Sequence, residues 1–520
     1  MLSRRRAALL LGTVLLLGAG LTAPARASEG GACAWTMYGH DLGRSFQQGC
    51  TSITTANVAT LRPRWVLSTP DSVTASPAVA DGVLYDGDWS GNFYAVAAAT
   101  GQVLWHDVLN DAETVSYGMV TASPTVTTLA GRQVVLVASG ATLYALDPAT
   151  GAVLASQSLD PRAHRDSSQV VEVETSPAVG PGGVIYSGLD FNEATGVGRA
   201  GMIAVRLVRT GSSYAFTVLW KFDPESGRVF TGAGALTFDP NANTDFGCGD
   251  VWSSPALDAG AGLLYFGTGN CQHPDLAKAA GQNWSEEMVA LHADTGAPAW
   301  TFRPAKDLTA AWADDDFGAS PNLIRTTNGR QLVGEGHKSA VYYARRRADG
   351  AAAWQTLAGQ PGNLMGGSPS QGGNAIGGFI GSTAVQGSDG IAQRILGATA
   401  LPVPDPSDAS SLDRSTWAVR ALDPATGKIL WVDRLAAPAY GPVSVAGGVV
   451  FVPDTFSDSL LALDAASGAT LWAFPMNGAP SSTLVVVGDS VYTGAGTGER
   501  TQDGGQNVLA GLSGIWAFGL

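Results

Sequence analysis

The 520-residue chain has few charged residues, and it lacks the short motifs on which several common enzyme classes depend. Charged side chains make up 14% of the sequence, and 44 acidic residues against 30 basic ones give a net charge of −14. Nucleic-acid binding needs a basic surface, so this balance argues against that function. The sequence contains no GxSxG phrase and no P-loop, and its six histidines are scattered, so hydrolase and phosphate chemistry have little support.

Long hydrophobic runs are missing after residue 27. No later segment holds the roughly 18 uncharged apolar residues that a membrane-spanning helix needs, so we expect a soluble mature protein. The first residues read MLSRRRAALLLGTVLLLGAGLTAPARA, with three arginines before an apolar run and Ala-Arg-Ala after it. This pattern predicts a signal peptide over residues 1–27 and a secreted protein that begins near Ser28. A twin-arginine export signal is the alternative.

Cysteine is scarce, since the chain has only Cys33, Cys50, Cys248 and Cys271. There is no CxxC and no CxxCH, so we expect no cysteine-based metal site and no haem in this chain. In an exported protein the four cysteines predict disulfides. Of the three possible connectivities, the pairs Cys33–Cys50 and Cys248–Cys271 close the shortest loops and leave no free thiol.

Glycine and proline are abundant, with 67 and 27 residues, which favours many short strands joined by tight turns. One phrase recurs along the chain: AVAAATGQVLW ending at Trp105, ALHADTGAPAW at Trp300, ALDPATGKILW at Trp431 and ALDAASGATLW at Trp472. Weaker copies precede Ala155 and end at Trp354. Each copy predicts a strand, a turn in which glycine supplies a positive φ, and a strand bearing a large aromatic that can pack between neighbouring sheets.

A second phrase begins each unit of the repeat. Its copies include TASPAVADGVLY from Thr74, TSPAVGPGGVIY from Thr175 and SSPALDAGAGLLY from Ser253, and a weaker copy near Gly381 brings the number of starts to eight. The starts lie about 40 to 80 residues apart, so longer units carry insertions. We therefore predict an all-β fold, an eight-bladed β-propeller of four-stranded blades that forms a single domain over residues 28–520.

The TG-x-x-x-W hairpin resembles the repeat of the eight-bladed quinoprotein propellers, which include the alcohol dehydrogenases that depend on pyrroloquinoline quinone (PQQ). The phrases WTMYGHDLGRSFQQ, VTASP and VWSSP are similar to those of the polyvinyl alcohol dehydrogenase-like branch. The resemblance covers the whole predicted mature chain. A similar repeat also occurs in a non-catalytic assembly scaffold of the outer membrane, so the repeat implies the fold more specifically than an activity.

The resemblance implies a cofactor site in the stretch GCGDVWSSPALDAGAGLLYFGTGN. There Trp252 would be the floor on which the planar PQQ stacks, and Asn270 would be a calcium ligand through its side-chain oxygen. The ordinary alternatives are a tryptophan of the core and an asparagine in a turn.

Three further positions match the family in the same way. Glu193 falls where the family places an acidic calcium ligand, and Asp316 resembles the carboxylate that contacts the metal and takes the substrate proton. Asp314 is the second choice for that catalytic position and Asp307 the third, because this chain has three consecutive acids here; an acidic surface loop is the alternative. Lys338 matches the basic residue that hydrogen-bonds the quinone oxygens, although it could also be an ordinary exposed lysine.

The chain departs from the family's alcohol dehydrogenases at two places. Thr74 stands near the position of a family glutamate, and the loop NDAETVSYGMVTASP lacks the vicinal disulfide that lies over the quinone. The polyvinyl alcohol dehydrogenase-like branch lacks that disulfide as well. The resemblance thus implies an enzyme that oxidises a small or polymeric alcohol with PQQ and calcium and passes electrons to an external acceptor.

Two other functions remain open at this point. One is a non-catalytic scaffold that binds another protein or a cell-wall polymer. The other is carbohydrate recognition by exposed aromatic residues, for which Trp89, Phe93 and Trp284 are the candidates.

Overall fold

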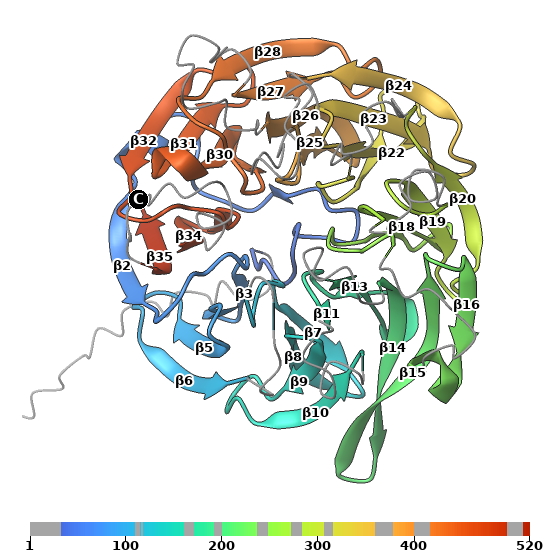
Figure 1. Ribbon diagram of the computed structural model, residues 1–520. Coiled ribbons are helices and arrows are strands. Elements are labelled where there is room, and N and C mark those ends of the chain that lie inside the picture. Colours follow the sequence, from blue (N-terminus) through green and yellow to red (C-terminus); the bar gives the residue numbers. More distant parts are fainter. Residues whose placement is uncertain are drawn as a thin grey trace, which may run out of the picture.

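The computed structural model describes residues 33–109, 115, 118–160, 171–191, 200–236, 248–271, 283–305, 316–358, 378–399, 417–496 and 513–520. Within these ranges the strands form eight separate sheets, and Figure 1 shows them arranged as a ring around a central axis. In most blades the strands follow one another in chain order from the axis to the rim and pair antiparallel; the exceptions are β2, which forms the outer edge of the eighth blade, and β1, which pairs in parallel with β29. The predicted eight-bladed β-propeller is thereby confirmed.

The first four blades follow the chain in order. The first contains β3 (Ala78–Ala80), β4 (Val83–Gly87), β5 (Asn92–Ala97) and β6 (Val103–Val108). The second contains β7 (Thr125–Leu129), β8 (Arg132–Ser139), β9 (Thr142–Leu146) and β10 (Val153–Ser158). The third contains β11 (Val171–Glu172), β12 (Ala178–Val179), β13 (Val184–Phe191), β14 (Gly201–Thr210), β15 (Ser213–Asp223) and β16 (Arg228–Thr231). The fourth contains β17 (Ala256–Asp258), β18 (Leu263–Gly267), β19 (Met288–His292) and β20 (Pro298–Phe302).

The next three blades continue in the same way. The fifth contains β21 (Asn322–Arg325), β22 (Gln331–Gly336), β23 (Val341–Arg346) and β24 (Ala352–Leu357). The sixth contains β25 (Ala384–Ser388), β26 (Ile391–Thr399), β27 (Ala418–Leu422) and β28 (Ile429–Arg434). The seventh contains β29 (Ser444–Ala446), β30 (Val449–Asp454), β31 (Ser459–Asp464) and β32 (Thr470–Pro475), and β1 (Gln47–Gln48) pairs in parallel with β29. Short 3₁₀ turns are η1 (Val58–Thr60), η2 (Pro181–Gly183), η3 (Gly232–Leu236) and η6 (Thr455–Ser457).

The eighth blade joins the two ends of the described chain. Its inner strands are β33 (Val485–Val487), β34 (Ser490–Ala495) and β35 (Gly514–Gly519), and its outer strand is β2 (Arg62–Ser68). β2 pairs antiparallel with β35 from Arg62 opposite Gly519 to Ser68 opposite Gly514. Because an early strand completes the last blade, the ring is closed by backbone hydrogen bonds.

Tryptophans link consecutive blades near the rim. Six indole N–H groups each donate a hydrogen bond of 2.8–3.2 Å to a backbone carbonyl of the next blade. The residue that accepts the bond lies three positions before a glycine with a positive φ. The tryptophans are Trp65, Trp105, Trp220, Trp300, Trp354 and Trp431. A Cβ at any of the six glycines would collide with the indole, so glycine serves both the turn and the close approach of the ring.

The second blade packs against the third in a different way, because its weak copy of the repeat has Ala155 where other copies have tryptophan. There the long β14–β15 hairpin of the third blade, which extends outward in Figure 1, contributes Phe216 and Val218 to the same apolar cluster as Ala155. Arg132 of the second blade also lies over the Tyr214 ring, 5.7 Å from its centroid. The insertion therefore supplies the packing that the missing aromatic would give.

Hydroxyl groups form a second set of links, next to the axis. In most blades the residue two positions before the inner strand is serine or threonine. Its backbone N–H donates to the hydroxyl of the equivalent residue in the next blade at 2.7–3.1 Å. The series runs through Thr483, Ser76, Ser123, Ser176, Ser254, Ser320 and Ser382. In the seventh blade this place is held by Pro442, which has no N–H to donate. The serine of the recurring S-P phrase thus joins neighbouring blades.

The segment over residues 35–52, here called the N-terminal belt, lies across the middle of the ring (Figure 1). Its backbone hydrogen-bonds to inner strands or adjoining turns of seven blades, at Val79, Val126, Leu257, Leu323, Val385, Val445 and Gly488. Arg44, fully buried, donates to the carbonyls of Pro255 and Ser176. Burial lowers the pKa of Arg44 to about 10, so it stays charged at neutral pH.

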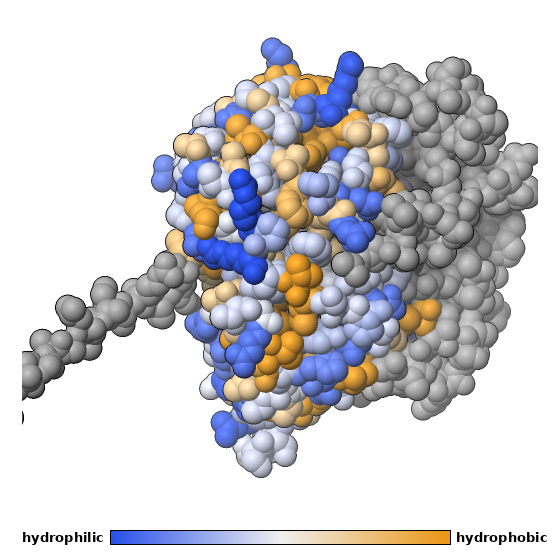
Figure 2. Space-filling view, turned by 90° about the vertical axis from the view of Figure 1, so that its left-hand side faces the viewer, coloured by the Kyte–Doolittle hydropathy of each residue, from blue (hydrophilic) through white to orange (hydrophobic). Residues whose placement is uncertain are grey.

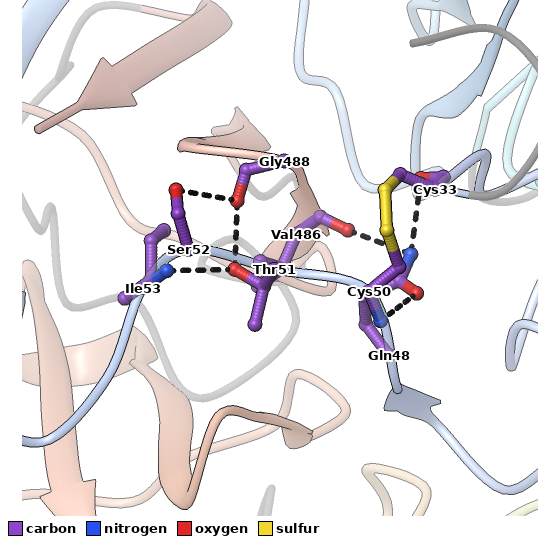
Figure 3. The surroundings of a disulfide bond; sticks show 8 residues. All are labelled: Cys33, Gln48, Cys50, Thr51, Ser52, Ile53, Val486 and Gly488. Atoms are coloured by element: carbon purple, nitrogen blue, oxygen red, sulfur yellow. Dashed lines mark hydrogen bonds between the residues drawn. A yellow bond between two sulfur atoms is a disulfide. The ribbon is translucent and has the colours of Figure 1, made fainter.

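The predicted Cys33–Cys50 disulfide is present, and it joins Cys33, just before the belt, to Cys50 near the end of the belt. Figure 3 shows the Gln48 side chain beside it, which donates to the carbonyls of Cys33 and Val486 at 3.1 and 3.2 Å and accepts from the Cys50 N–H at 2.9 Å. Thr51 then donates to Gly488 of the eighth blade at 2.7 Å. The disulfide therefore fixes the belt where the ring closes.

The outer side of the ring is formed by the fourth strands of the blades. Figure 2 shows apolar and polar residues interspersed on the side that carries β2. Exposed aliphatic residues such as Val66, Leu104 and Val432 lie on these strands, at 40–50% exposure. No helix in the described part of the chain is long and apolar enough to cross a membrane.

Replacing both Cys33 and Cys50 with serine should lower stability. The disulfide closes a loop with a sequence separation of 17, and a loop of this size corresponds to about 3 kcal/mol of unfolded-state entropy. Urea denaturation without reductant checks this, and reduction of the wild type should move its midpoint toward that of the variant. An unchanged midpoint in the variant would contradict a stabilising role for the disulfide.

Trp300→Phe should weaken the junction of the fourth and fifth blades. The variant keeps an aromatic ring but loses the 2.8 Å hydrogen bond to the Arg347 carbonyl, which costs about 1 kcal/mol, and the smaller ring adds a packing loss. The change is measured as the free energy of unfolding in urea. Leu357→Ala, at a side chain 57% exposed, is the control and should stay within about 0.5 kcal/mol of the wild type.

Candidate functional site

The predicted cofactor residues within the described ranges come from the fourth and fifth blades, at one end of their inner two strands. Trp252 and Asp316 precede the inner strands β17 and β21, whereas Asn270 and Lys338 follow the second strands β18 and β22. Since β17–β18 and β21–β22 are antiparallel pairs, the start of one strand and the end of the next meet at the same edge.

Three of these side chains lie together. Lys338 Nζ is 2.7 Å from Asp316 Oδ2 and 5.0 Å from the centroid of the Trp252 ring. The Lys338 backbone N–H also donates to the Asp316 carbonyl at 2.9 Å, which holds the two loops together. The side chain of Asp316 is 1% exposed and that of Lys338 is 12% exposed. The structure thus places a carboxylate, an ammonium group and a flat aromatic face within one small region.

Gly318 allows the Trp252 ring to approach this loop. A Cβ at Gly318 would lie 2.9 Å from Trp252 Cη2 and still closer to the Phe379 carbonyl. Any larger residue would collide with the indole and with the Phe379 carbonyl. The glycine two residues after the acid therefore has a packing role that the sequence did not reveal.

The predicted Cys248–Cys271 disulfide is present beside Asn270. The Asn270 carbonyl accepts a hydrogen bond of 2.9 Å from Gly249, and the Gly269 N–H donates to the Asp250 carbonyl at the same distance. A Cβ at Gly269 would collide with the Asp250 carboxyl group. The disulfide and these contacts fix the loop that carries Asn270 against the loop that leads to Trp252.

The loops of Asn270 and Asp316 are neighbours. A Cβ at Gly267, three residues before Asn270, would lie 2.8 Å from the backbone oxygen of Phe317, the residue after Asp316. Phe317 itself is buried, 1% exposed, and its ring contacts His337 with centroids 4.7 Å apart. Asn270, Asp316 and Lys338 therefore belong to one continuous junction between the two blades.

Three predicted acids lie outside the described residues. These are Glu193, a predicted calcium ligand, and Asp314 and Asp307, the second and third choices for the catalytic carboxylate.

The third blade contributes an acidic cluster that sequence reasoning missed. Carboxylate oxygens of Glu172, Glu174 and Asp190 all lie within 4.8 Å of one another. Glu172 on β11 is paired directly with Asp190 on β13. The Val251 N–H donates to the Leu189 carbonyl at 3.0 Å, so this cluster borders the loop that carries Trp252. The sequence separates these acids by up to 18 positions, and only the pairing of β11 with β13 could have revealed the cluster.

Two further acids are buried within the blades. Asp86 on β4 and Glu335 on β22 are both 0% exposed, and burial raises the pKa of each well above its usual range. The two acids stand at equivalent positions of their blades, because each directly follows the residue that pairs with the first residue of the inner strand. Asp86 follows Tyr85, which pairs with Ala78, and Glu335 follows Gly334, which pairs with Asn322. A Cβ at Gly267 would lie 2.5 Å from Glu335 Oε1, so this carboxyl group lies between the two blades that carry the site.

The aromatic residues considered for carbohydrate recognition do not form an exposed set. The expectation for Phe93 was wrong: it lies on β5, is 0% exposed and packs against Trp105 in the core. Trp89 is half-buried and donates to Thr74 Oγ1 at 2.8 Å. Trp284 is also half-buried and packs edge-on against Phe222. The four central residues of β5 are all buried, so an aromatic there lies in the core whichever face of the sheet it is on.

Comparison with protein families gives a match over residues 35–357 to the glucose/ethanol/alcohol dehydrogenase β-propeller domain, the PQQ family. The chain belongs to this family. Residues 416–513 also match the family of the outer membrane protein assembly factor BamB. The predicted resemblance to PQQ-dependent alcohol dehydrogenases is thereby confirmed.

Among curated proteins, a polyvinylalcohol dehydrogenase of Sphingopyxis sp. (strain 113P3) is 23% identical over 95% of this chain and 77% of its own length. Another polyvinylalcohol dehydrogenase, from Pseudomonas sp., is 26% identical over 92% of this chain and 76% of its own length. The dehydrogenase subunit of a quinone-dependent alcohol dehydrogenase from Gluconacetobacter polyoxogenes is 27% identical over 59% of this chain and 43% of its own length.

Solved structures support the fold. A europium-containing methanol dehydrogenase superposes with a TM-score of 0.73 at 16% identity, covering 95% of this chain and 99% of its own. The quinohemoprotein alcohol dehydrogenase of Comamonas testosteroni gives a TM-score of 0.71 at 19% identity, covering 94% of this chain and 80% of its own. At this level of identity the likeness establishes the propeller, and the chemistry must be argued from the residues of the site.

Glu335→Gln should change how stability depends on pH. A raised pKa means that the folded state holds the proton more tightly than the unfolded chain, so this carboxyl group lowers the unfolding free energy as pH rises above about 4. Glutamine cannot ionise, so the stability of the variant relative to the wild type should increase between pH 5 and pH 8. Thermal denaturation across this range measures it, with the exposed Asp294→Asn as control. A constant difference across the range would show that Glu335 does not titrate as argued.

Proposed function

We propose that the protein is a quinoprotein dehydrogenase that oxidises an alcohol with PQQ and calcium as cofactors. The observation that carries this proposal is the meeting of Trp252, Asp316 and Lys338 at the junction of the fourth and fifth blades. The sequence separates them by 22 to 86 positions. A structural role alone would explain each of them, but it does not require a flat aromatic face, a buried carboxylate and an ammonium group at one place.

The residues present fit these cofactors. A planar aromatic cofactor needs a flat face, which the Trp252 indole offers, and Gly318 leaves room for that ring beside Asp316. Calcium takes oxygen ligands, which Asp316 and the Asn270 side chain would supply together with Glu193. Gly318 adds no further carboxylate near Asp316, and an extra acid at that position is the feature associated with lanthanides in the family, so calcium is the proposed ion.

When bound, PQQ supplies the electrophilic carbonyl carbon that accepts the hydride, and calcium polarises that carbonyl. Trp252 would fix the plane of the cofactor. Lys338 would donate hydrogen bonds to its carbonyl oxygens and stabilise the negative charge of the reduced form. Asp316, as general base, would take the proton of the substrate hydroxyl on its carboxylate. The burial of Asp316 excludes water from this exchange, which strengthens each electrostatic interaction.

The relatives named above guide the choice of substrate. Two of them are polyvinylalcohol dehydrogenases, so secondary and polymeric alcohols are the proposed substrates. The chain has no CxxCH phrase, and electrons would therefore pass to an external acceptor. The arginine-rich N-terminus and the two disulfides support a location outside the cytoplasm.

A non-catalytic scaffold is the second candidate. The match of residues 416–513 to the BamB family favours it, because that name denotes an assembly factor. The scaffold predicts a folded protein that takes up no PQQ.

Asp316→Asn tests the proposed base, and PQQ uptake is measured alongside turnover. Wild-type protein should take up one PQQ per chain in the presence of Ca²⁺, seen by absorbance, and should oxidise alcohols in a dye-linked assay. Asp316→Asn keeps the shape but removes the base, so turnover should fall by about 10²- to 10⁴-fold. Asp294→Asn, an exposed acid in the fourth blade, should retain wild-type turnover. Folded wild-type protein without PQQ uptake would instead support the scaffold.

A further inference from the structure

We propose that the Cys248–Cys271 disulfide is a positioning element of the candidate site, so that the chain binds PQQ and calcium only when this bond is closed. Trp252 and Asn270 lie on the two segments that the disulfide joins. The inference rests on the proposed function and concerns how the same site is assembled. It makes uptake of the cofactors follow disulfide formation in an oxidising compartment.

The first support is the place of the disulfide in the fourth blade. β17 and β18 form a hairpin whose last regular pair toward the site is Ala256 with Tyr265. Beyond this pair the regular ladder stops, and the two stretches that follow carry the predicted cofactor residues. Cys248 and Cys271 then meet as an isolated antiparallel bridge. The disulfide therefore closes the open end of the hairpin around the residues of the site.

The second support is the way in which the loop of Asn270 is held. On its N-terminal side, the Gly269 carbonyl accepts a hydrogen bond of 2.9 Å from the Glu286 N–H. On its C-terminal side, the next residue is Cys271, which is bonded to Cys248. Opening the disulfide would remove a covalent anchor one residue from the proposed calcium ligand. The side-chain oxygen of Asn270 would then lose its fixed position, while the ladder of the blade stays intact.

The third support is the path of the segment that leads to Trp252. Gly249, directly after Cys248, has a φ of +69°, and a Cβ there would lie 2.6 Å from the Trp284 carbonyl oxygen. Trp284 has a φ of 70°, and non-glycine residues keep such a conformation only where the surrounding structure fixes it. This segment is therefore closely packed, and the disulfide joins it covalently to the loop of the proposed calcium ligand.

Formation of the bond follows thiol–disulfide exchange. The two thiols lose two protons and two electrons, the Sγ–Sγ bond forms, and a disulfide of the oxidising partner is reduced to two thiols. Cys248 is 3% exposed and Cys271 is half-buried. Groups that hold metal ligands in place typically contribute about 10- to 100-fold to metal affinity. We expect a loss of this order in a chain without the bond.

The test compares the two disulfides of the chain. Cys248→Ser with Cys271→Ser reproduces the unlinked state without a thiol that would react with the quinone, and Cys33→Ser with Cys50→Ser is the matched control. The sequence separations are 23 and 17, so both changes should lower the free energy of unfolding by similar amounts. Isothermal titration of the metal-free mature chain measures Ca²⁺ binding in the presence of PQQ and PQQ binding in the presence of Ca²⁺, after subtraction of the heat of mixing the two in buffer.

Only one of the two variants should lose affinity. We expect Cys248→Ser with Cys271→Ser to bind each ligand about 10- to 100-fold more weakly than the wild type. Cys33→Ser with Cys50→Ser should keep the wild-type affinities despite its lower stability. Circular dichroism and urea denaturation show whether each variant is folded under the conditions of the titration. Should the serine pair at 248 and 271 not fold, alanine at both positions provides the same comparison.

The outcomes distinguish the inference from the function on which it rests. No binding of PQQ by folded wild-type protein would overturn the proposed function and the positioning role together. Wild-type binding with unchanged affinity in the variant at 248 and 271 would leave the proposed function standing and overturn the positioning role. Equal losses in both disulfide variants would also overturn it, because affinity would then follow overall stability. Failure of both the serine and the alanine pair to fold would overturn it as well, since the disulfide would then serve the fold instead of the site.

Discussion

The rest of the structure depends on the closure of the ring, in which β2 pairs with β35. A four-stranded blade cannot bury both of its faces alone, so each blade needs a neighbour on either side. A linear array of eight would leave two apolar faces in water. Because β2 precedes the first blade and completes the eighth, the backbone hydrogen bonds of one sheet remove both open faces. Everything at the axis then has a fixed position, including the belt and the loops of the site.

Closure also explains how a repeat can carry a site. In the first, fourth and fifth blades, the first residue of the inner strand pairs with Tyr85, Tyr265 and Gly334 of the second strand. Four positions after these partners lie Trp89, Gly269 and Lys338, respectively. Each of these blades has a residue at this position, and its side chain can change without altering the hydrogen bonds between the strands. The candidate site therefore comes from variation at repeated positions of two adjacent blades, and the glycines between them set how closely the loops approach.

The fold could be predicted because its determinants are local and repeated. The turn glycine and the following tryptophan recur with fixed spacing, and the structure shows the indole of one blade against the glycine of the next. The convergence of Trp252, Asp316 and Lys338 could be expected only through resemblance, since no spacing rule links residues of different blades. The burial of Glu335 and the formation of the acidic cluster around Glu172 depend on strand register and on packing between blades. Neither can be predicted from composition or periodicity.

The buried charges of the axis follow one rule, which is that each ionised group has a fixed partner. Arg44 remains charged because the carbonyls of Pro255 and Ser176 accept its hydrogen bonds. Glu335 has no such partner among the described residues, and burial drives it toward the neutral acid. Asp316 lies at similar depth beside Lys338, whose ammonium group supplies the compensating charge. A carboxylate in this position can serve as a base or a metal ligand only while some cation stays close to it.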